Sequence, residues 1–134
     1  LTYGDGLSNV DLKSLLKFHN DHGKILTVTG VRPPGRFGEL RANDEGIVAE
    51  FNEKPQASDG LISGGFFVCE PKLFNVLTDN NDLVFEQEPM RELVARKELA
   101  VYEHKDFWQC MDTARDWKLL NQLFATNKAP WKTW

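Results

Sequence analysis

Two aspartates stand in similar local settings near opposite ends of the sequence. Asp5 follows a short strand-like stretch and precedes Gly6, whereas Asp112 follows an apolar run and precedes Thr113. In α/β proteins a carboxylate at the end of a strand stands where such folds bind ligands. Two carboxylates from distant strands can share one hard cation, since Mg²⁺ typically takes one or two carboxylates together with substrate phosphates. The pair therefore favours a magnesium site.

Two further features could complete such a site. Lys54 lies beside Glu53, and Gly64 and Gly65 are adjacent within the apolar run 61–69. A lysine ammonium neutralises phosphate as a point charge, and a glutamate accepts hydrogen bonds from sugar hydroxyls. Paired glycines inside a strand indicate that some group approaches the backbone closely. The combination suits a phosphorylated sugar better than it suits acid–base hydrolysis.

Each of these features also has a purely structural alternative, which the residues alone leave open. An aspartate before glycine is a common turn dipeptide, and Asp112-Thr113 can be simply a helix cap. A neighbouring glutamate and lysine are ordinarily a solvated pair that contributes little stability. Adjacent glycines can mark a β-bulge. His19 and His22 are expected to be surface or packing residues of a helix.

Strands and helices that would position these residues alternate at the start of the chain. A helix is expected from Val10, capped by Ser8 or Asn9 and ended by Gly23, because leucines recur at helical spacing. Residues 24–31 are β-branched and alternating, which predicts a strand. Strand, helix and strand in that order favour a parallel pair between the opening stretch and residues 24–31.

The later elements follow from turn residues and apolar runs. A hairpin is expected over residues 36–42 and 47–52, and residues 61–69 should form a central strand that is covered on both faces. Short helices or strands are expected at 71–77, 88–97, 99–103 and 108–111. A final helix should follow Asp112, with Trp117, Leu120 and Phe124 on one face.

Composition narrows the class of protein. The 134 residues are 41% hydrophobic and 27% charged, which is ordinary for one soluble globular domain or part of one. A net charge of −4 argues against a duplex nucleic-acid partner. Apolar runs fall short of membrane-spanning length. Cys69 and Cys110 lack metal-ligand spacing, so free thiols in a reducing compartment, and hence a cytoplasmic location, are expected.

Five blocks of the chain resemble, in their order, those of the sugar-1-phosphate nucleotidylyltransferases. The blocks are Tyr3-Gly4-Asp5-Gly6, Gly35-Arg36-Phe37-Gly38, Glu53-Lys54-Pro55, Ser63-Gly64-Gly65-Phe66 and Met111-Asp112-Thr113. Finer details at 33–37, 85–89, 107–109 and 128–134 are similar to the glucose-1-phosphate cytidylyltransferases of that family. The similarity covers essentially the whole chain.

The resemblance implies a fold and a reaction. The fold would be α/β, the C-terminal part of a nucleotide-diphospho-sugar transferase fold, which is Rossmann-like with a mixed sheet. The reaction would be CTP plus α-D-glucose 1-phosphate giving CDP-glucose and pyrophosphate, with Mg²⁺ as cofactor. In the family, that product feeds dideoxy-sugar and O-antigen synthesis in bacteria.

Residue roles are also implied by position. Asp5 and Asp112 resemble the Mg²⁺ ligands of the family, and Lys54 resembles its contact to the sugar phosphate, so these three are the implied catalytic residues. The residues implied to bind the sugar are Glu53, as a hydroxyl acceptor, and Gly38, Ile62, Gly64 and Gly65, as pocket lining.

The chain departs from the family in one large respect. It contains no glycine-rich loop of the GGxGTR type, and residues 35–38 cannot replace that loop because they lie between strands rather than opening a helix. Residues 1–134 are therefore expected to be a single partial domain, the sugar-phosphate-binding C-terminal part, without the N-terminal nucleotide-binding part. We expect the chain to be inactive alone and to bind CTP only with that part supplied.

A partial domain should also leave apolar positions such as Ile25 and Val28 without their covering strands, so self-association into a homo-oligomer is expected. The alternative function is a stand-alone module that binds a sugar phosphate or assembles without catalysis. The aromatic tail motivates the assembly alternative, since Trp131 and Trp134 could anchor an interface or pack on their own domain.

Overall fold

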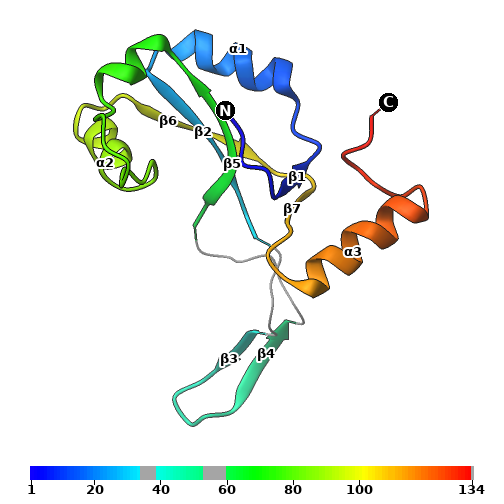
Figure 1. Cartoon of the computed structure of the whole chain (residues 1–134). Helices are drawn as coiled ribbons and strands as arrows, with labels where there is room; N and C mark the ends of the chain where they lie inside the picture. The colour runs from blue at the N-terminus through cyan, green and yellow to red at the C-terminus, as the bar shows by residue number, and fades with distance from the viewer. Residues whose placement is uncertain (34–38, 53–59, 134) are drawn as a thin grey trace.

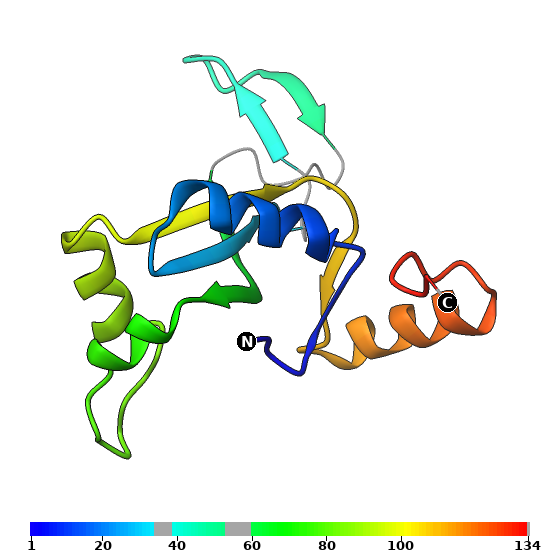
Figure 2. The same ribbon diagram turned by 90° about the horizontal axis from the view of Figure 1, so that it is seen from above.

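The computed structural model describes residues 1–33, 39–52 and 60–133 as a mixed α/β structure (Figure 1). Its strands are β1 (Gly6–Ser8), β2 (Leu26–Val31), β3 (Glu39–Ala42), β4 (Val48–Asn52), β5 (Ile62–Cys69), β6 (Leu99–His104) and β7 (Trp108–Cys110). Its helices are α1 (Leu12–His22), the 3₁₀ helix η1 (Pro71–Asn75), α2 (Glu88–Ala95) and α3 (Ala114–Ala125). In Figures 1 and 2, α2 and α3 lie at opposite ends of the molecule.

The central sheet has the strand order β5-β2-β6. Strand β2 pairs antiparallel with β5 and parallel with β6, so the sheet is mixed, as predicted. Four residues form the buried core cluster on this sheet: Leu26, Phe67, Leu73 and Leu93. The core thus joins β2 and β5 to η1 and α2.

The predicted parallel pairing of the opening stretch is wrong. Thr2 instead forms an antiparallel bridge with Phe66, and β1 pairs antiparallel with β7. The parallel partner of β2 is β6, which lies much later in the chain. The first residues lie along the outer edge of β5, where the Tyr3 N–H donates to the Gly65 carbonyl at 2.9 Å.

The predicted central position of residues 61–69 is also wrong. Strand β5 is an end strand of the three-stranded sheet, and its outer backbone groups bond to the first residues of the chain. The Phe67 N–H donates to the Leu1 carbonyl at 2.9 Å. An apolar run indicates covered faces, but it does not state whether a strand is paired on both edges, and here the N-terminal segment partly replaces a neighbouring strand.

Helix α1 is fixed by a cap at each end. The Asp11 carboxylate accepts from the Lys13 and Ser14 N–H groups at 2.9 and 3.2 Å, so the cap is Asp11 and not the predicted Ser8 or Asn9. Gly23 ends the helix in the left-handed conformation at φ 64°, as predicted. The helix buries Leu15 and His19 against the sheet.

The predicted hairpin is confirmed for its described residues, since β3 and β4 pair antiparallel. It projects away from the central sheet in both views (Figures 1 and 2). Leu40, Ile47 and Phe51 on the hairpin are 60–65% exposed. Apolar surface is thus exposed on the hairpin, whereas Ile25 and Val28, which were predicted to lose their cover, are half-buried and pack against the core cluster.

Helix α3 and the tail meet the predictions in part. Leu120 is buried, whereas Trp117 and Phe124 on the same helix are more than half exposed. The Trp131 ring stacks on Phe107 at 5.4 Å between centroids, so this tryptophan packs on its own domain, and Trp134 lies outside the described residues. None of the described helices is long and apolar enough to cross a membrane.

Candidate functional site

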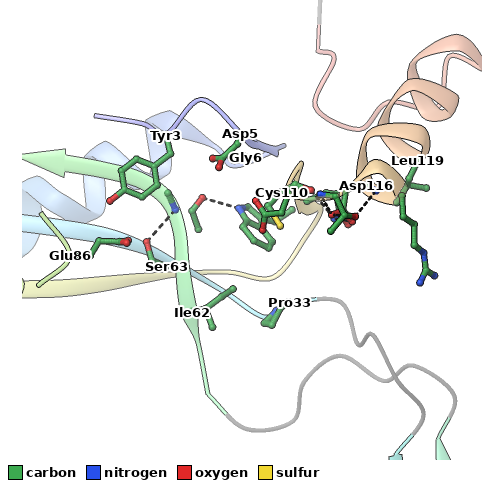
Figure 3. Close-up of a pocket in the computed structure, with 17 residues that line it drawn as sticks. Tyr3, Asp5, Gly6, Pro33, Ile62, Ser63, Glu86, Cys110, Asp116 and Leu119 are labelled. Atoms are coloured by element: carbon green, nitrogen blue, oxygen red, sulfur yellow. Dashed lines mark hydrogen bonds between the residues drawn. The ribbon is translucent and has the colours of Figure 1, made fainter. Parts of the chain in front are cut away.

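A pocket of about 640 Å³ lies where β1, β5 and β7 meet the start of α3 (Figure 3). It brings together five of the predicted site residues: Asp5, Ile62, Gly64, Gly65 and Asp112. Figure 3 shows Tyr3, Ser63 and Glu86 on one side and Cys110 and Asp116 on the other, with Asp5 between them. The remaining predicted residues, Gly38, Glu53 and Lys54, lie outside the described residues and stay predictions.

The two aspartates reach this pocket through the pairing of β1 with β7. Gly6 is opposite Cys110 in the register, and the Met111 N–H donates to the Asp5 carbonyl at 2.8 Å. Asp5 therefore precedes one strand and Asp112 follows its antiparallel neighbour, so both residues stand at the same end of the ribbon. Both residues are exposed toward solvent.

The start of α3 tests the predicted helix cap at Asp112-Thr113. The helix cap is Thr113, whose hydroxyl accepts from the Asp116 N–H at 3.2 Å, while the Asp116 carboxylate accepts from the Thr113 N–H at 3.0 Å. The predicted helix cap at Asp112-Thr113 is therefore confirmed, with Thr113 as the capping residue. The side-chain bonds of this cap are made by Thr113 and Asp116, and Asp112 takes no part in them.

The glycine pair is confirmed as a point of close approach, and the approaching groups belong to the chain itself. A Cβ on Gly64 would lie 2.9 Å from Val31 Cγ1. The Trp108 indole N–H donates to the Gly64 carbonyl at 2.8 Å, which fixes the indole at the pocket wall. Gly65 has φ 75°, and a Cβ there would lie 3.2 Å from the Tyr3 ring. The glycines therefore set the positions of two aromatic lining residues.

Gly65→Ala should destabilise the chain more than Gly60→Ala. Both glycines have positive φ, which costs an alanine about 1–2 kcal/mol, but only Gly65 also faces the Tyr3 ring, whereas Gly60 faces open space. We expect Gly65→Ala to lose about 1–3 kcal/mol beyond its control, the usual range for overpacking. Urea unfolding of both variants measures the difference, and equal losses would show that Tyr3 is not held against Gly65.

Charge in the pocket is strongly acidic. Among its described lining residues are four carboxylates, those of Asp5, Glu86, Asp112 and Asp116, and one guanidinium, that of Arg115. An anionic substrate would be repelled by this set unless cations offset it. Arg115 is the one positive side chain among the described lining residues, so further cations would have to come from elsewhere.

Two weakly acidic groups of the pocket stay protonated at neutral pH. Burial raises the pKa of the Tyr3 phenol, and the neighbouring carboxylates of Glu86 and Asp5 raise it further. Burial likewise raises the pKa of the Cys110 thiol, with added contributions from Asp112 and Asp116. Since the thiolate is the reactive form of cysteine, Cys110 is a poor nucleophile here.

The donor set fits Mg²⁺ in the way that nucleotide-dependent enzymes hold it. Within residues 1–33, 39–52 and 60–133 no group of three or more His, Cys, Asp or Glu side chains could hold a metal ion. Asp5 and Asp112 are two carboxylates, which are hard oxygen donors, and both line this open pocket. Such an arrangement suits an ion that completes its coordination with substrate phosphates and water.

Sequence reasoning missed several lining residues, namely Tyr3, Glu86, Trp108, Arg115 and Asp116. A signal existed for the first three, because Tyr3, Glu86 and Trp108 fall inside segments that carry the family resemblance. Arg115 and Asp116 enter the pocket because the first turn of α3 faces it.

Comparison with known families defines the class of this protein. The family model described as nucleotidyl transferase matches residues 2–121. The chain therefore belongs to the nucleotidyl transferase family. The predicted nucleotide-diphospho-sugar transferase fold with a mixed sheet agrees with its structural neighbours.

Individual relatives refine this class. The glucose-1-phosphate cytidylyltransferase of Salmonella typhimurium is 47% identical over 133 residues, which cover 99% of this chain and 51% of the relative. The mannose-1-phosphate guanylyltransferase of Mycobacterium tuberculosis is 30% identical over 118 residues, which cover 84% of this chain and 33% of the relative. The chain thus spans about half the length of the Salmonella relative and about a third of the length of the Mycobacterium relative.

A solved structure gives the same fold. HddC from Yersinia pseudotuberculosis superposes with a TM-score of 0.58 at 19% identity, covering 90% of this chain and 52% of that one. At this identity the likeness concerns the fold alone.

Proposed function

We propose that the pocket binds a sugar 1-phosphate and its metal ion for transfer of a nucleotidyl group, the favoured reaction being CTP plus glucose 1-phosphate giving CDP-glucose and pyrophosphate. One observation carries the proposal. Asp5 and Asp112, near opposite ends of the sequence, line one pocket with Gly64 and Gly65. The product would then feed dideoxy-sugar and O-antigen synthesis, as the resemblance implies.

In an acidic pocket, a bound metal ion and Lys54 would each offset negative charge on the substrates. The family resemblance implies a divalent metal ion, and Mg²⁺ would offset the repulsion between the two phosphate-bearing substrates. Asp5 and Asp112 are the residues that would hold it. Lys54 would contact the sugar phosphate as a point charge, and Glu53 would accept from a sugar hydroxyl.

The nucleophile in this reaction needs no activation by a base. It is a phosphate oxygen that is already ionised at neutral pH, so catalysis consists of positioning and charge stabilisation. The protonated Tyr3 and Cys110 agree with this, because neither is set up to abstract a proton. Tyr3, held by Gly65 and by Phe67 at 5.4 Å between ring centroids, would form a fixed wall.

We further propose that residues 1–134 form the sugar-phosphate half of the active site and need additional chain for transfer, since the sequence contains no glycine-rich triphosphate loop. The free thiols of Cys69 and Cys110 favour a reducing compartment such as the cytoplasm.

A second candidate function is sugar-phosphate binding without catalysis. It is supported by the pocket, which brings together Ile62, Gly64 and Gly65, three of the residues implied to bind the sugar. Self-association could accompany it through the exposed hairpin. The stacking of Trp131 on Phe107 argues against that tryptophan as an interface anchor.

Binding of glucose 1-phosphate should depend on Lys54 and, through Mg²⁺, on Asp112. Calorimetry at saturating Mg²⁺ should show Lys54→Ala weakening binding by about tenfold to a hundredfold, since a hydrogen bond to a charged group contributes about 1.5–3 kcal/mol. Asp112→Asn should remove the difference between titrations with and without Mg²⁺.

Lys118→Ala is the matched control, because Lys118 is an exposed lysine of α3 and does not line the pocket. It should bind like the parent chain. Equal affinities for the parent and Lys54→Ala would remove Lys54 from its assigned role, and a Mg²⁺ effect that persists in Asp112→Asn would place the metal elsewhere.

A further inference from the structure

A continuous hydrogen-bond chain joins the end of α1 to the central sheet, away from the pocket. The Lys24 N–H lies 2.9 Å from His22 Nδ1, and His22 Nε2 lies 2.7 Å from Thr27 Oγ1. The same hydroxyl lies 2.8 Å from His19 Nδ1, and His19 Nε2 lies 3.3 Å from a Glu70 carboxylate oxygen. His19 is 2% exposed and Thr27 is fully buried, so the contact between His19 and Thr27 is shielded from water, whereas His22 and Lys24 are half-buried and Glu70 is exposed.

The donors and acceptors of these four hydrogen bonds can be assigned in one consistent order, starting from Lys24. Lys24 donates from its backbone, so Nδ1 of His22 is an acceptor and the neutral ring carries its hydrogen on Nε2. That hydrogen is donated to the Thr27 hydroxyl oxygen, and the hydroxyl donates its own hydrogen to His19 Nδ1. His19 then carries its hydrogen on Nε2, toward Glu70. Every donor has one acceptor only while both imidazoles are neutral.

We propose that this chain of contacts is an acid-sensitive latch that holds the C-terminal end of α1 on β2, and that protonation of His22 opens it. A proton on His22 Nδ1 would face the Lys24 N–H, so two donors would meet and the bond between them would be lost. Thr27 transmits the change to His19, because its single hydroxyl bridges both rings.

Burial, His19 and the positive charge of Lys24 favour the neutral His22 ring, whereas the Asp21 carboxylate favours the charged one. His22 has two charged neighbours close in sequence, Asp21 on its own helix and Lys24 in the following turn. From β2 it meets the uncharged Thr27. Glu70, the residue that follows β5, is linked to it only through Thr27 and His19. On the β6 side Tyr102 contacts Phe18, whose ring lies 5.0 Å from that of His22.

The resulting pH dependence has a definite sign. Burial lowers the pKa of His22, and His19 and Lys24 lower it further. The unfolded chain therefore takes up a proton near pH 6.5 before the folded chain does. The stabilisation by the latch should be complete above that pH and should be lost as the pH falls through the lower pKa of the folded state.

The tautomers can be read directly in the parent chain. Long-range ¹H–¹⁵N correlation spectra at pH 7.5 should show His19 and His22 both neutral with the hydrogen on Nε2. A charged His22, or either ring with its hydrogen on Nδ1, would overturn the latch. This measurement needs no variant and so does not depend on any substitution being tolerated.

Release of the end of α1 on protonation of His22 is tested by hydrogen exchange of the α1 amides between pH 7.5 and pH 5. The exchange rates are corrected for the intrinsic effect of pH. Protection at the end of α1 should fall by about tenfold for each unit by which folding lowers the pKa of His22. His22→Gln, which keeps an amide donor and cannot titrate in this range, should lose this dependence. If the parent ring titrates with no change in α1 exchange, or His22→Gln keeps the dependence, the proposal is wrong.

Discussion

Incubated with CTP, glucose 1-phosphate and Mg²⁺, the 134-residue chain should release no pyrophosphate above the rate seen without protein. The pocket offers carboxylates for a metal and a fixed aromatic wall, but its described lining supplies one guanidinium against four carboxylates. A triphosphate needs several donors and cations around it, and the sequence does not contain the glycine-rich loop that the family resemblance implies for this task. Enzymes commonly accelerate their reactions by at least about 10⁶-fold, so active and inactive chains should differ in pyrophosphate release by a factor that is easy to measure.

A coupled pyrophosphate assay measures the release, with the Salmonella typhimurium glucose-1-phosphate cytidylyltransferase as positive control. Binding of glucose 1-phosphate by the same preparation would show that the pocket is formed. Appreciable turnover would contradict the view that a nucleotide-binding part is needed. In that event, loss of the activity in Asp112→Asn but not in the control Asp79→Asn would still place the chemistry in this pocket, since Asp79 is an exposed aspartate outside it.

The sequence predicted those elements whose signals are local. Gly23 ends α1 because a left-handed residue is needed there, and the polar turn at 43–46 joins two strands that do pair. The partners of β1, β2 and β5 were not predicted correctly, because strand pairing depends on contacts between distant segments. Thr2 reaches Phe66 and β1 reaches β7 across most of the chain, which no local pattern reports.

The same distinction applies to the candidate site. A carboxylate beside a strand end was visible at Asp5 and at Asp112, and the structure brings both to one pocket even though the assumed pairing was wrong. The glycine pair indicated a close approach without naming the approaching groups, which are Tyr3 at Gly65 and Val31 at Gly64, with the Trp108 indole bonded to the Gly64 carbonyl. Contact partners of this kind follow from the tertiary fold and not from residue type.

Leu93→Ala should remove a large part of the stability of the folded chain. Leu93 is fully buried in the cluster that joins α2 to β2, β5 and η1. Truncating a buried leucine to alanine costs about 2–5 kcal/mol, because the transfer free energy is lost and a cavity remains. Against a total of about 5–15 kcal/mol for an ordinary domain, this loss should lower the urea midpoint strongly, as followed by circular dichroism.

Val94→Ala is the matched control, since Val94 is the next residue of the same helix and is 61% exposed. It should change stability by no more than about 0.5 kcal/mol. The comparison bears on the pocket because Tyr3 packs against the same core cluster and also lines the pocket. Leu93→Ala should therefore loosen the Tyr3 wall and weaken glucose 1-phosphate binding even where the chain stays folded. Equal midpoints for the two variants would show that α2 does not share one cooperative core with the sheet, and Tyr3 would then owe its position to Gly65 and not to that core.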